Sequence, residues 1–144
     1  MSQLPYLDEH ATDIAADVDA VWTALLATLD RAGMAGYARI VGCADYTASG
    51  PRPLAEGSTI PGFRVVTALP AAELALEGRH RFSSYALIFR IEPDGAGRSR
   101  LRAESRGVFP GLLGGVYRLL VIGTGGHVVA VRRLLSAVRR RSEA

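Results

Sequence analysis

The stretch GLLGGVYRLLVIGTGGHVVAVRRLL, residues 111–135, is the most apolar long segment of the sequence, and the fold depends on how it is interpreted. A helix that spans a membrane needs about twenty apolar residues with few charges. This stretch is long enough, but it contains Arg118, His127, Arg132 and Arg133 together with several glycines. We therefore expect no membrane span here.

The same stretch has the period of an amphipathic helix. Counted at 3.6 residues per turn, one stripe holds Val116, Leu120, Gly123, His127, Val131, Leu134 and Val138. The arginines lie on the flanks and the back of that helix, which predicts a helix with one face packed on a sheet. Glycine inside a helix costs about 1 kcal/mol relative to alanine, so we expect a kink or break around residues 123–126.

The glycines GTGG at residues 123–126 could also indicate a dinucleotide loop, which requires the pattern G-x-G-x-x-G. Here the sixth position is Val128, so that pattern fails and we expect no cofactor. His10, His80 and His127 could in principle bind zinc, but nothing in their spacing brings them together. We therefore expect no metal site.

The first third of the chain reads as a strand followed by a helix. Residues 6–16 alternate with a period of two, which places Asp8, His10, Thr12 and Ile14 on one face. In DVDAVWTALLATLDRAG the apolar residues then fall at helical spacing, with Asp17 as the expected N-cap and Gly33 as the stop. Residues 37–46 are read as another strand, followed by a loop rich in glycine and proline.

Four more strands are expected downstream, at residues 63–69, 73–77, 82–92 and 98–107. The last has the clearest alternation in the chain, because every second residue from Arg98 to Arg106 is charged and the residues between them are small or apolar. This pattern predicts one solvated face and one face turned inward. On the preceding strand, the face that includes Tyr85 and Phe89 is bulkier and is expected to point toward the helix.

Size and composition narrow the class of protein. A chain of 144 residues with 49% hydrophobic and 22% charged residues is expected to form a single domain, residues 1–144. One cysteine, Cys43, and the absence of a basic, apolar leader in MSQLPYLDEH favour a cytoplasmic protein. The net charge of +3 comes from arginine alone and is too small to indicate nucleic-acid binding.

At IAADVDAVWTALL the chain resembles the START and polyketide cyclase/dehydrase superfamily, whose members often place a strand before an I-x-A-P-x-x-x-V-W helix start. Ile14, Ala16, Val21 and Trp22 match, and Asp17 stands where proline is usual. EGSTIPGFRVV, LALEGRHRFSSYALIFRIEP and GHVVAVRRLLSAV are similar in style. The resemblance implies an α+β helix-grip fold, with a curved antiparallel sheet around a long C-terminal helix and an apolar cavity between them.

The resemblance also implies a function, the binding of a small hydrophobic molecule such as a lipid, a sterol or a polyketide-like compound. Three polar candidates for orienting that ligand are His10, Tyr85 and His127. Plausible wall residues, each equally plausible as ordinary core, are Phe63, Val65, Leu76, Phe89, Leu101, Phe109, Leu120 and Val131. Apolar burial of about 25 cal/mol per Å² would drive binding.

Two alternatives stay open. The first is a cyclase, aromatase or dehydratase in which an imidazole acts as general base and a tyrosine or arginine stabilises an enolate. No catalytic motif is present onto which a known set of catalytic residues could be carried. The second is a structural or interaction module, such as a homodimer, with a solid interior. The volume of the internal cavity separates this second alternative from the other two.

Overall fold

The computed structural model describes residues 4–33, 49–60, 62–80, 83–108, 111 and 126–144. The strand expected at residues 37–46 therefore lies outside the described residues, as do Phe109, Leu120 and most of the expected helix break at residues 123–126. The described elements follow the order that the sequence predicts for an α+β chain. A strand and a helix come first, five strands follow, and a helix comes last.

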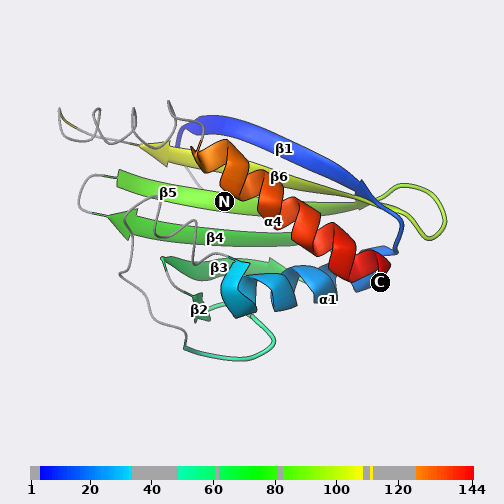
Figure 1. The fold of residues 1–144 in the computed structure, drawn as a ribbon. Helices are drawn as coiled ribbons and strands as arrows, with labels where there is room; N and C mark the ends of the chain where they lie inside the picture. Colours follow the sequence, from blue (N-terminus) through cyan, green and yellow to red (C-terminus); the bar gives the residue numbers. More distant parts are fainter. Residues whose placement is uncertain (1–3, 34–48, 61, 81–82, 109–110, 112–125) are drawn as a thin grey trace.

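In the described residues, one antiparallel sheet of six strands forms the framework (Figure 1). Its strands are β1 (Tyr6–Ile14), β2 (Thr59–Ile60), β3 (Phe63–Leu69), β4 (Glu73–His80), β5 (Ser83–Pro93) and β6 (Ser99–Val108). They lie side by side in the order β1-β6-β5-β4-β3-β2, so the first strand pairs with the last one. The sequence predicted β3 with its observed bounds and the others within a few residues, but the two-residue strand β2 was missed.

Helix α1 (Val18–Thr28) begins where the sequence predicts, because Asp17 caps it. The Oδ1 atom of Asp17 accepts a hydrogen bond from the backbone N–H of Ala20 at 2.9 Å, which satisfies one of the free donors of the first turn. A single π-helical turn, η1 (Leu29–Gly33), continues the helix up to the predicted stop. Val21, Leu25 and Leu29 are each at most 2% exposed, so one side of the helix is core.

Helix α4 (Gly126–Glu143) follows the predicted stripe over its described length. Val131, Leu134 and Val138 are buried, while Arg132 and Arg133 are exposed. The last turn is fastened to the start of the chain, because Glu143 Oε2 accepts a hydrogen bond from the backbone N–H of Ala15 at 2.8 Å. This bond lowers the pKa of the Glu143 carboxyl below its ordinary value, and the nearby Arg139 adds to the effect.

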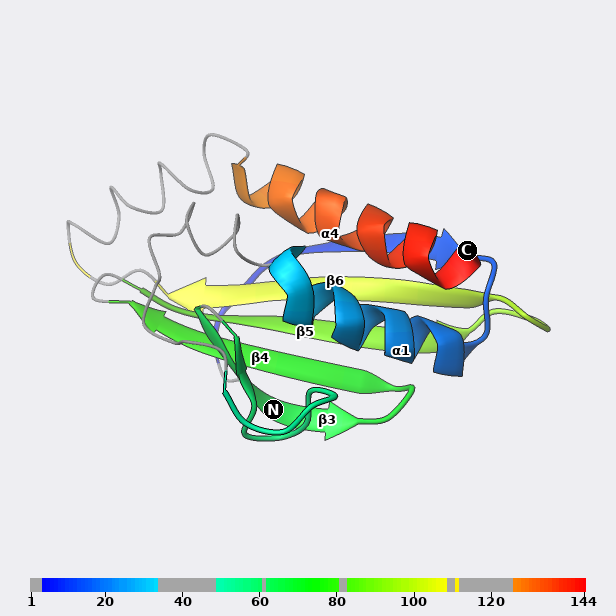
Figure 2. The ribbon, with the colours of Figure 1, turned by 60° about the horizontal axis from the view of Figure 1, so that its bottom comes forward.

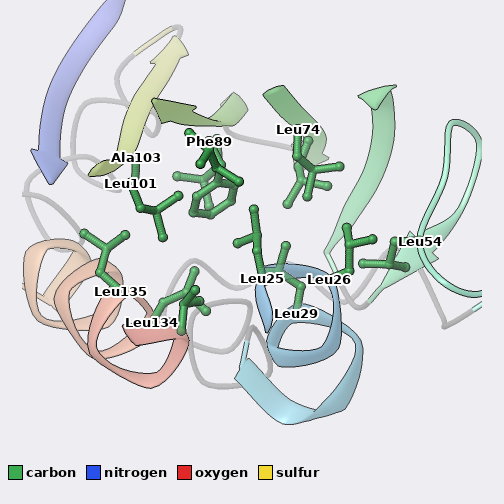
Figure 3. Packing of buried hydrophobic residues seen from close by; sticks show 14 of the residues in the cluster. Leu25, Leu26, Leu29, Leu54, Leu74, Phe89, Leu101, Ala103, Leu134 and Leu135 are labelled. Carbon is green, nitrogen blue, oxygen red and sulfur yellow. The ribbon is translucent and has the colours of Figure 1, made fainter. Parts of the chain in front are cut away.

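Both helices lie on the same face of the sheet (Figure 2). Helix α4 packs mainly on β1 and α1, and α1 also contacts β5 and β6. Figure 3 shows the result, with Leu134 and Leu135 of α4 beside Leu25, Leu26 and Leu29 of α1 under the arc of strands. Phe89 and Leu101 on the sheet are fully buried against this layer. The hydrophobic effect of closing this layer is what holds the helices on the sheet.

The opposite face of the sheet carries a network of ion pairs. Arg90 bonds both Glu73 (Nε–Oε1 3.2 Å) and Glu104 (Nη1–Oε1 3.0 Å), and Arg106 also bonds Glu104. Burial alone would raise the pKa of Glu104, but the hydrogen bonds from Arg106 and Arg90 outweigh it and hold that pKa below its ordinary value. The predicted charged outer face of β6 is thus confirmed, and its ion-paired residues are Arg100, Arg102, Glu104 and Arg106.

Candidate functional site

The inner face of the sheet is defined by the strand register. His10 of β1 pairs with Ala103 of β6, and Ala103 pairs in turn with Phe89 of β5. Side chains directly opposite one another on antiparallel strands point to the same face, so these three residues share the face that the helices cover. His10 therefore points inward, together with Ile14, as the alternation of β1 predicted.

His10 is held by a carboxylate on its own strand. Its Nε2 atom lies 3.2 Å from Oδ2 of Asp8, and the two side chains are 18% and 28% exposed. A carboxylate at this distance fixes the ring and favours a proton on the nitrogen that faces it. The other ring nitrogen is then the one left to accept a hydrogen bond. The sequence placed Asp8 on the same face as His10 but did not single it out as a partner.

Ser105 adds a second polar group to this part of the sheet. It pairs with Asp8 on one side and with Leu87 on the other, so it lies on the inner face at the register position next to the imidazole pair. The residue is only 1% exposed, and within the described part of the chain its hydroxyl has no hydrogen-bond partner. A buried hydroxyl without a partner costs about 1–3 kcal/mol. Sequence analysis noted only that this position is small and faces inward.

Tyr85 lies two residues before Leu87 on β5 and shares its inward face. Its hydroxyl donates a hydrogen bond to the carbonyl oxygen of Gly62 at 2.8 Å. Its ring meets Phe63 edge to face, with centroids 5.2 Å apart and planes at 76°. The tyrosine is 6% exposed, so ring and hydroxyl are both accommodated by the protein itself. This arrangement matches the core interpretation of Tyr85, which the sequence left as at least equal to its interpretation as a ligand contact.

The predicted wall residues within the described part of the chain all lie in one hydrophobic cluster. Phe63, Val65, Leu76, Phe89, Leu101 and Val131 are buried to within 1% of full burial. They share this cluster with buried side chains of α1 and α4, and a ligand contact at any of them stays a prediction. His127 lies in the first turn of α4, and its side chain is outside the described part, as are Phe109 and Leu120.

A hollow of about 640 Å³ lies elsewhere, between α1 and residues 52–56 where they face β3. Its apolar lining includes Trp22, Leu26, Leu54, Ala68 and Pro70. Figure 3 shows Leu54 on the opposite side of Leu26 from the α4 residues Leu134 and Leu135. We call this hollow the α1 groove. None of the predicted site residues that the structure describes lines it, so the sequence missed it, although Pro51, Pro53 and Pro70 mark its surroundings as loops.

Among the described residues, His, Cys, Asp and Glu side chains form no group of three or more that could hold a metal ion. Within the same residues, no helix is both long enough and apolar enough to cross a membrane.

The chain is similar in structure to several solved proteins, although no sequence match is found. No protein-family profile and no curated protein sequence matches the chain. The Zhui aromatase/cyclase from Streptomyces sp. R1128 is similar in structure, with a TM-score of 0.63, 19% identity and coverage of 98% of this chain and 94% of the other. A conserved protein from Geobacillus kaustophilus has a TM-score of 0.59, 13% identity and 93% coverage of both chains.

A norcoclaurine synthase point mutant from Thalictrum flavum, in complex with a transition-state analogue, has a TM-score of 0.58 and 12% identity, and covers 97% of both chains. With the curved sheet and the terminal helix already described, these similarities establish the helix-grip fold. The fold is thus shared with an aromatase/cyclase and with a norcoclaurine synthase, and a fold alone does not fix an activity.

Proposed function

We propose that this protein binds a small, largely hydrophobic molecule between its sheet and its C-terminal helix. The observation that carries the proposal is the group of polar residues Ser105, His10 and Asp8 on a largely apolar inner wall. The hydroxyl of Ser105 is buried and has no partner among the described residues. A ligand oxygen that bonded this hydroxyl would remove its desolvation cost, and the surrounding apolar wall would bury the rest of the ligand.

This chemistry specifies the kind of ligand. Ser105 can donate or accept, and the ring nitrogen of His10 that does not face Asp8 can accept. A hydroxyl or phenol fits both groups, since it can donate to the imidazole and accept from the serine. Lipids with a free hydroxyl, sterols and phenolic polyketide-like molecules all belong to this class.

A matched ligand pair tests the proposal. We expect 2-naphthol to bind more tightly than naphthalene in fluorescence titrations of the purified protein. Ser105→Ala should weaken naphthol binding about tenfold and leave naphthalene binding unchanged, because only naphthol has the oxygen that bonds the serine. Equal affinity for both molecules in the wild-type protein, or no binding of either, would overturn the proposal.

Ser99→Ala is the control variant. Ser99 lies on the same strand and the same face, but its hydroxyl already donates to the carbonyl oxygen of Ala16 at 2.7 Å. Its loss should lower stability without changing the preference for naphthol. Native mass spectrometry of freshly purified protein complements the titration, since a co-purifying molecule with a hydroxyl group is the expected result.

The pair formed by His10 and Asp8 favours a second function, a cyclase or aromatase type of reaction in the same place. An imidazole held by a carboxylate can remove a proton adjacent to a ketone, which starts an intramolecular carbonyl condensation. His10→Asn separates the two functions. If the protein is an enzyme, the variant should still bind a linear polyketone but should no longer speed its cyclisation. If the wild-type protein does not speed that reaction, it acts as a binding protein only.

A further inference from the structure

The α1 groove is large enough for a ligand of its own. Its volume of about 640 Å³ lies within the range of small-molecule sites, which begins near 300 Å³. It is formed by Trp22 and Leu26 of α1, Leu54 of the facing loop, and Ala68 and Pro70 at the end of β3. These residues differ from the polar cluster of the inner wall, so the groove is a separate site.

Arg52 is the arginine that lines the groove, but its guanidinium is already occupied by the protein. Its Nε atom donates to Oδ1 of Asp30 at 2.6 Å, and Nη2 donates to the carbonyl oxygen of Thr59 at 3.0 Å. Nη1 donates to the carbonyl oxygens of Ser49 and Pro51 at 2.9 and 3.0 Å. Arg52 therefore fastens the loop of residues 49–59 beneath α1, and it has few donors left for an anionic ligand.

The two carboxylates that line the groove, Asp30 and Glu56, differ in whether an arginine neutralises them. Asp30 is paired with Arg52, so their charges cancel at close range. Glu56 also lines the groove, and its side chain is exposed and takes part in no ion pair within the described residues. Summed over the lining residues that the structure describes, the charge is therefore negative. A ligand that carries a positive charge is favoured over a neutral one, and an anion is disfavoured.

The aromatic part of the lining also favours a ligand with a positive charge. Trp22 is half-buried and lines the groove, and indole is the side chain that attracts organic cations most strongly. We propose that the α1 groove is a second binding site, which takes a small aromatic amine in its protonated form. The apolar lining buries the ring system of the ligand, and Glu56 and Trp22 select the ammonium group.

Three naphthalene derivatives of equal size test this site by NMR titration of labelled protein. 1-Naphthylmethylamine should bind about fivefold more tightly than 1-naphthylmethanol, as expected for one partly screened charge pair. 1-Naphthoic acid should bind most weakly. Glu56→Gln should remove the advantage of the amine over the alcohol, and Asp94→Asn, which removes an exposed carboxylate from the β5–β6 turn, should preserve it.

A blocking variant locates the binding. Thr23 is exposed on α1 and lines the groove, so Thr23→Phe should fill part of the space and weaken amine binding severalfold. Ala20→Phe places the same ring at an exposed position of α1 that does not line the groove, and it should leave binding unchanged. Ser105→Ala should also leave amine binding unchanged, which keeps this test separate from that of the inner site. An amine that binds no better than the acid, or binding that survives Thr23→Phe, would overturn the proposal.

Discussion

Tyr85 lies directly across from Gly78 in the β4–β5 ladder, and its ring occupies the space that a side chain at residue 78 would need. A Cβ atom at this position would overlap both the Tyr85 ring and the carbonyl oxygen of Gly62. That carbonyl is also the acceptor for the tyrosine hydroxyl. Glycine at residue 78 is therefore a requirement of the contact between Tyr85 and the start of β3.

Gly78→Ala should consequently destabilise the protein by about 1–3 kcal/mol, the usual cost of forcing extra volume into a packed site. Urea unfolding followed by circular dichroism measures the change. Ser84→Ala, on the outer face of the neighbouring strand, should change stability by less than about 0.5 kcal/mol. If the two variants proved equally stable, the close approach of Tyr85 to Gly78 would be wrong.

Tyr85→Phe should remove one hydrogen bond and retain the aromatic packing on Phe63. We expect a loss of about 1 kcal/mol, because the carbonyl oxygen of Gly62 loses a partner in a buried place. Tyr85→Leu should cost more, since it also removes the edge-to-face contact. Thermal unfolding of both variants measures this order, and a reversed order would contradict the described geometry.

Glu104→Gln should lower stability mainly at neutral pH. The folded state holds the pKa of Glu104 below its ordinary value, so its carboxylate stabilises the fold fully above that ordinary value. This contribution is lost as the pH falls through the folded-state pKa. The difference between wild type and variant should therefore be about 1–3 kcal/mol at pH 7 and shrink in acid. Urea midpoints measured from pH 7 to pH 3 test the trend.

Glu92→Gln serves as the comparison for Glu104. Glu92 pairs with Arg102 at 3.0 Å, but both side chains are about half exposed, at 50% and 41%. Exposed pairs contribute about 0–1 kcal/mol, so this variant should be nearly as stable as the wild type at every pH. A larger effect at Glu92 than at Glu104 would contradict the assignment of Glu104 as the centre of the network.

Arg52→Lys should loosen the loop of residues 49–59, although the charge is kept. A lysine offers three donors at one point, and it cannot reach Asp30 and the carbonyl oxygens of Ser49 and Thr59 at the same time. We expect faster proteolytic cleavage within this loop, mapped by mass spectrometry. Asp30→Asn should have a smaller effect, because its amide oxygen can still accept from Arg52, only the negative charge is lost, and the carbonyl bonds stay in place.

Much of the fold followed from local patterns in the sequence. The alternation from Arg98 to Gly107 placed the arginines outside and Leu101 inside, and the helical spacing after Asp17 gave α1 with its cap. These signals are strong because each depends on neighbours a few residues apart. The two-residue strand β2 carried no such signal, since Thr59 and Ile60 are too few to show a period.

The candidate site was less predictable, because it depends on which strands are neighbours. His10 and Ser105 lie at neighbouring register positions only because β1 pairs with β6, across more than ninety residues of sequence. Alternation placed each of them on an inward face without saying that they share one region. The α1 groove was missed for a related reason, since Trp22, Leu54 and Pro70 come from three segments and none of them has an unusual local pattern.

The bond between Glu143 and the Ala15 backbone joins residues far apart in the sequence, and in the described sheet β1 has β6 as its paired neighbour. During translation, the first strand and α1 must therefore wait until β6 and α4 have left the ribosome. Val138 of α4, which is fully buried, is synthesised long after the core residues of α1. Until then the apolar side of α1 is uncovered, so we expect the nascent chain to bind chaperones. Because these contacts are far apart in sequence, we also expect the fold to form slowly.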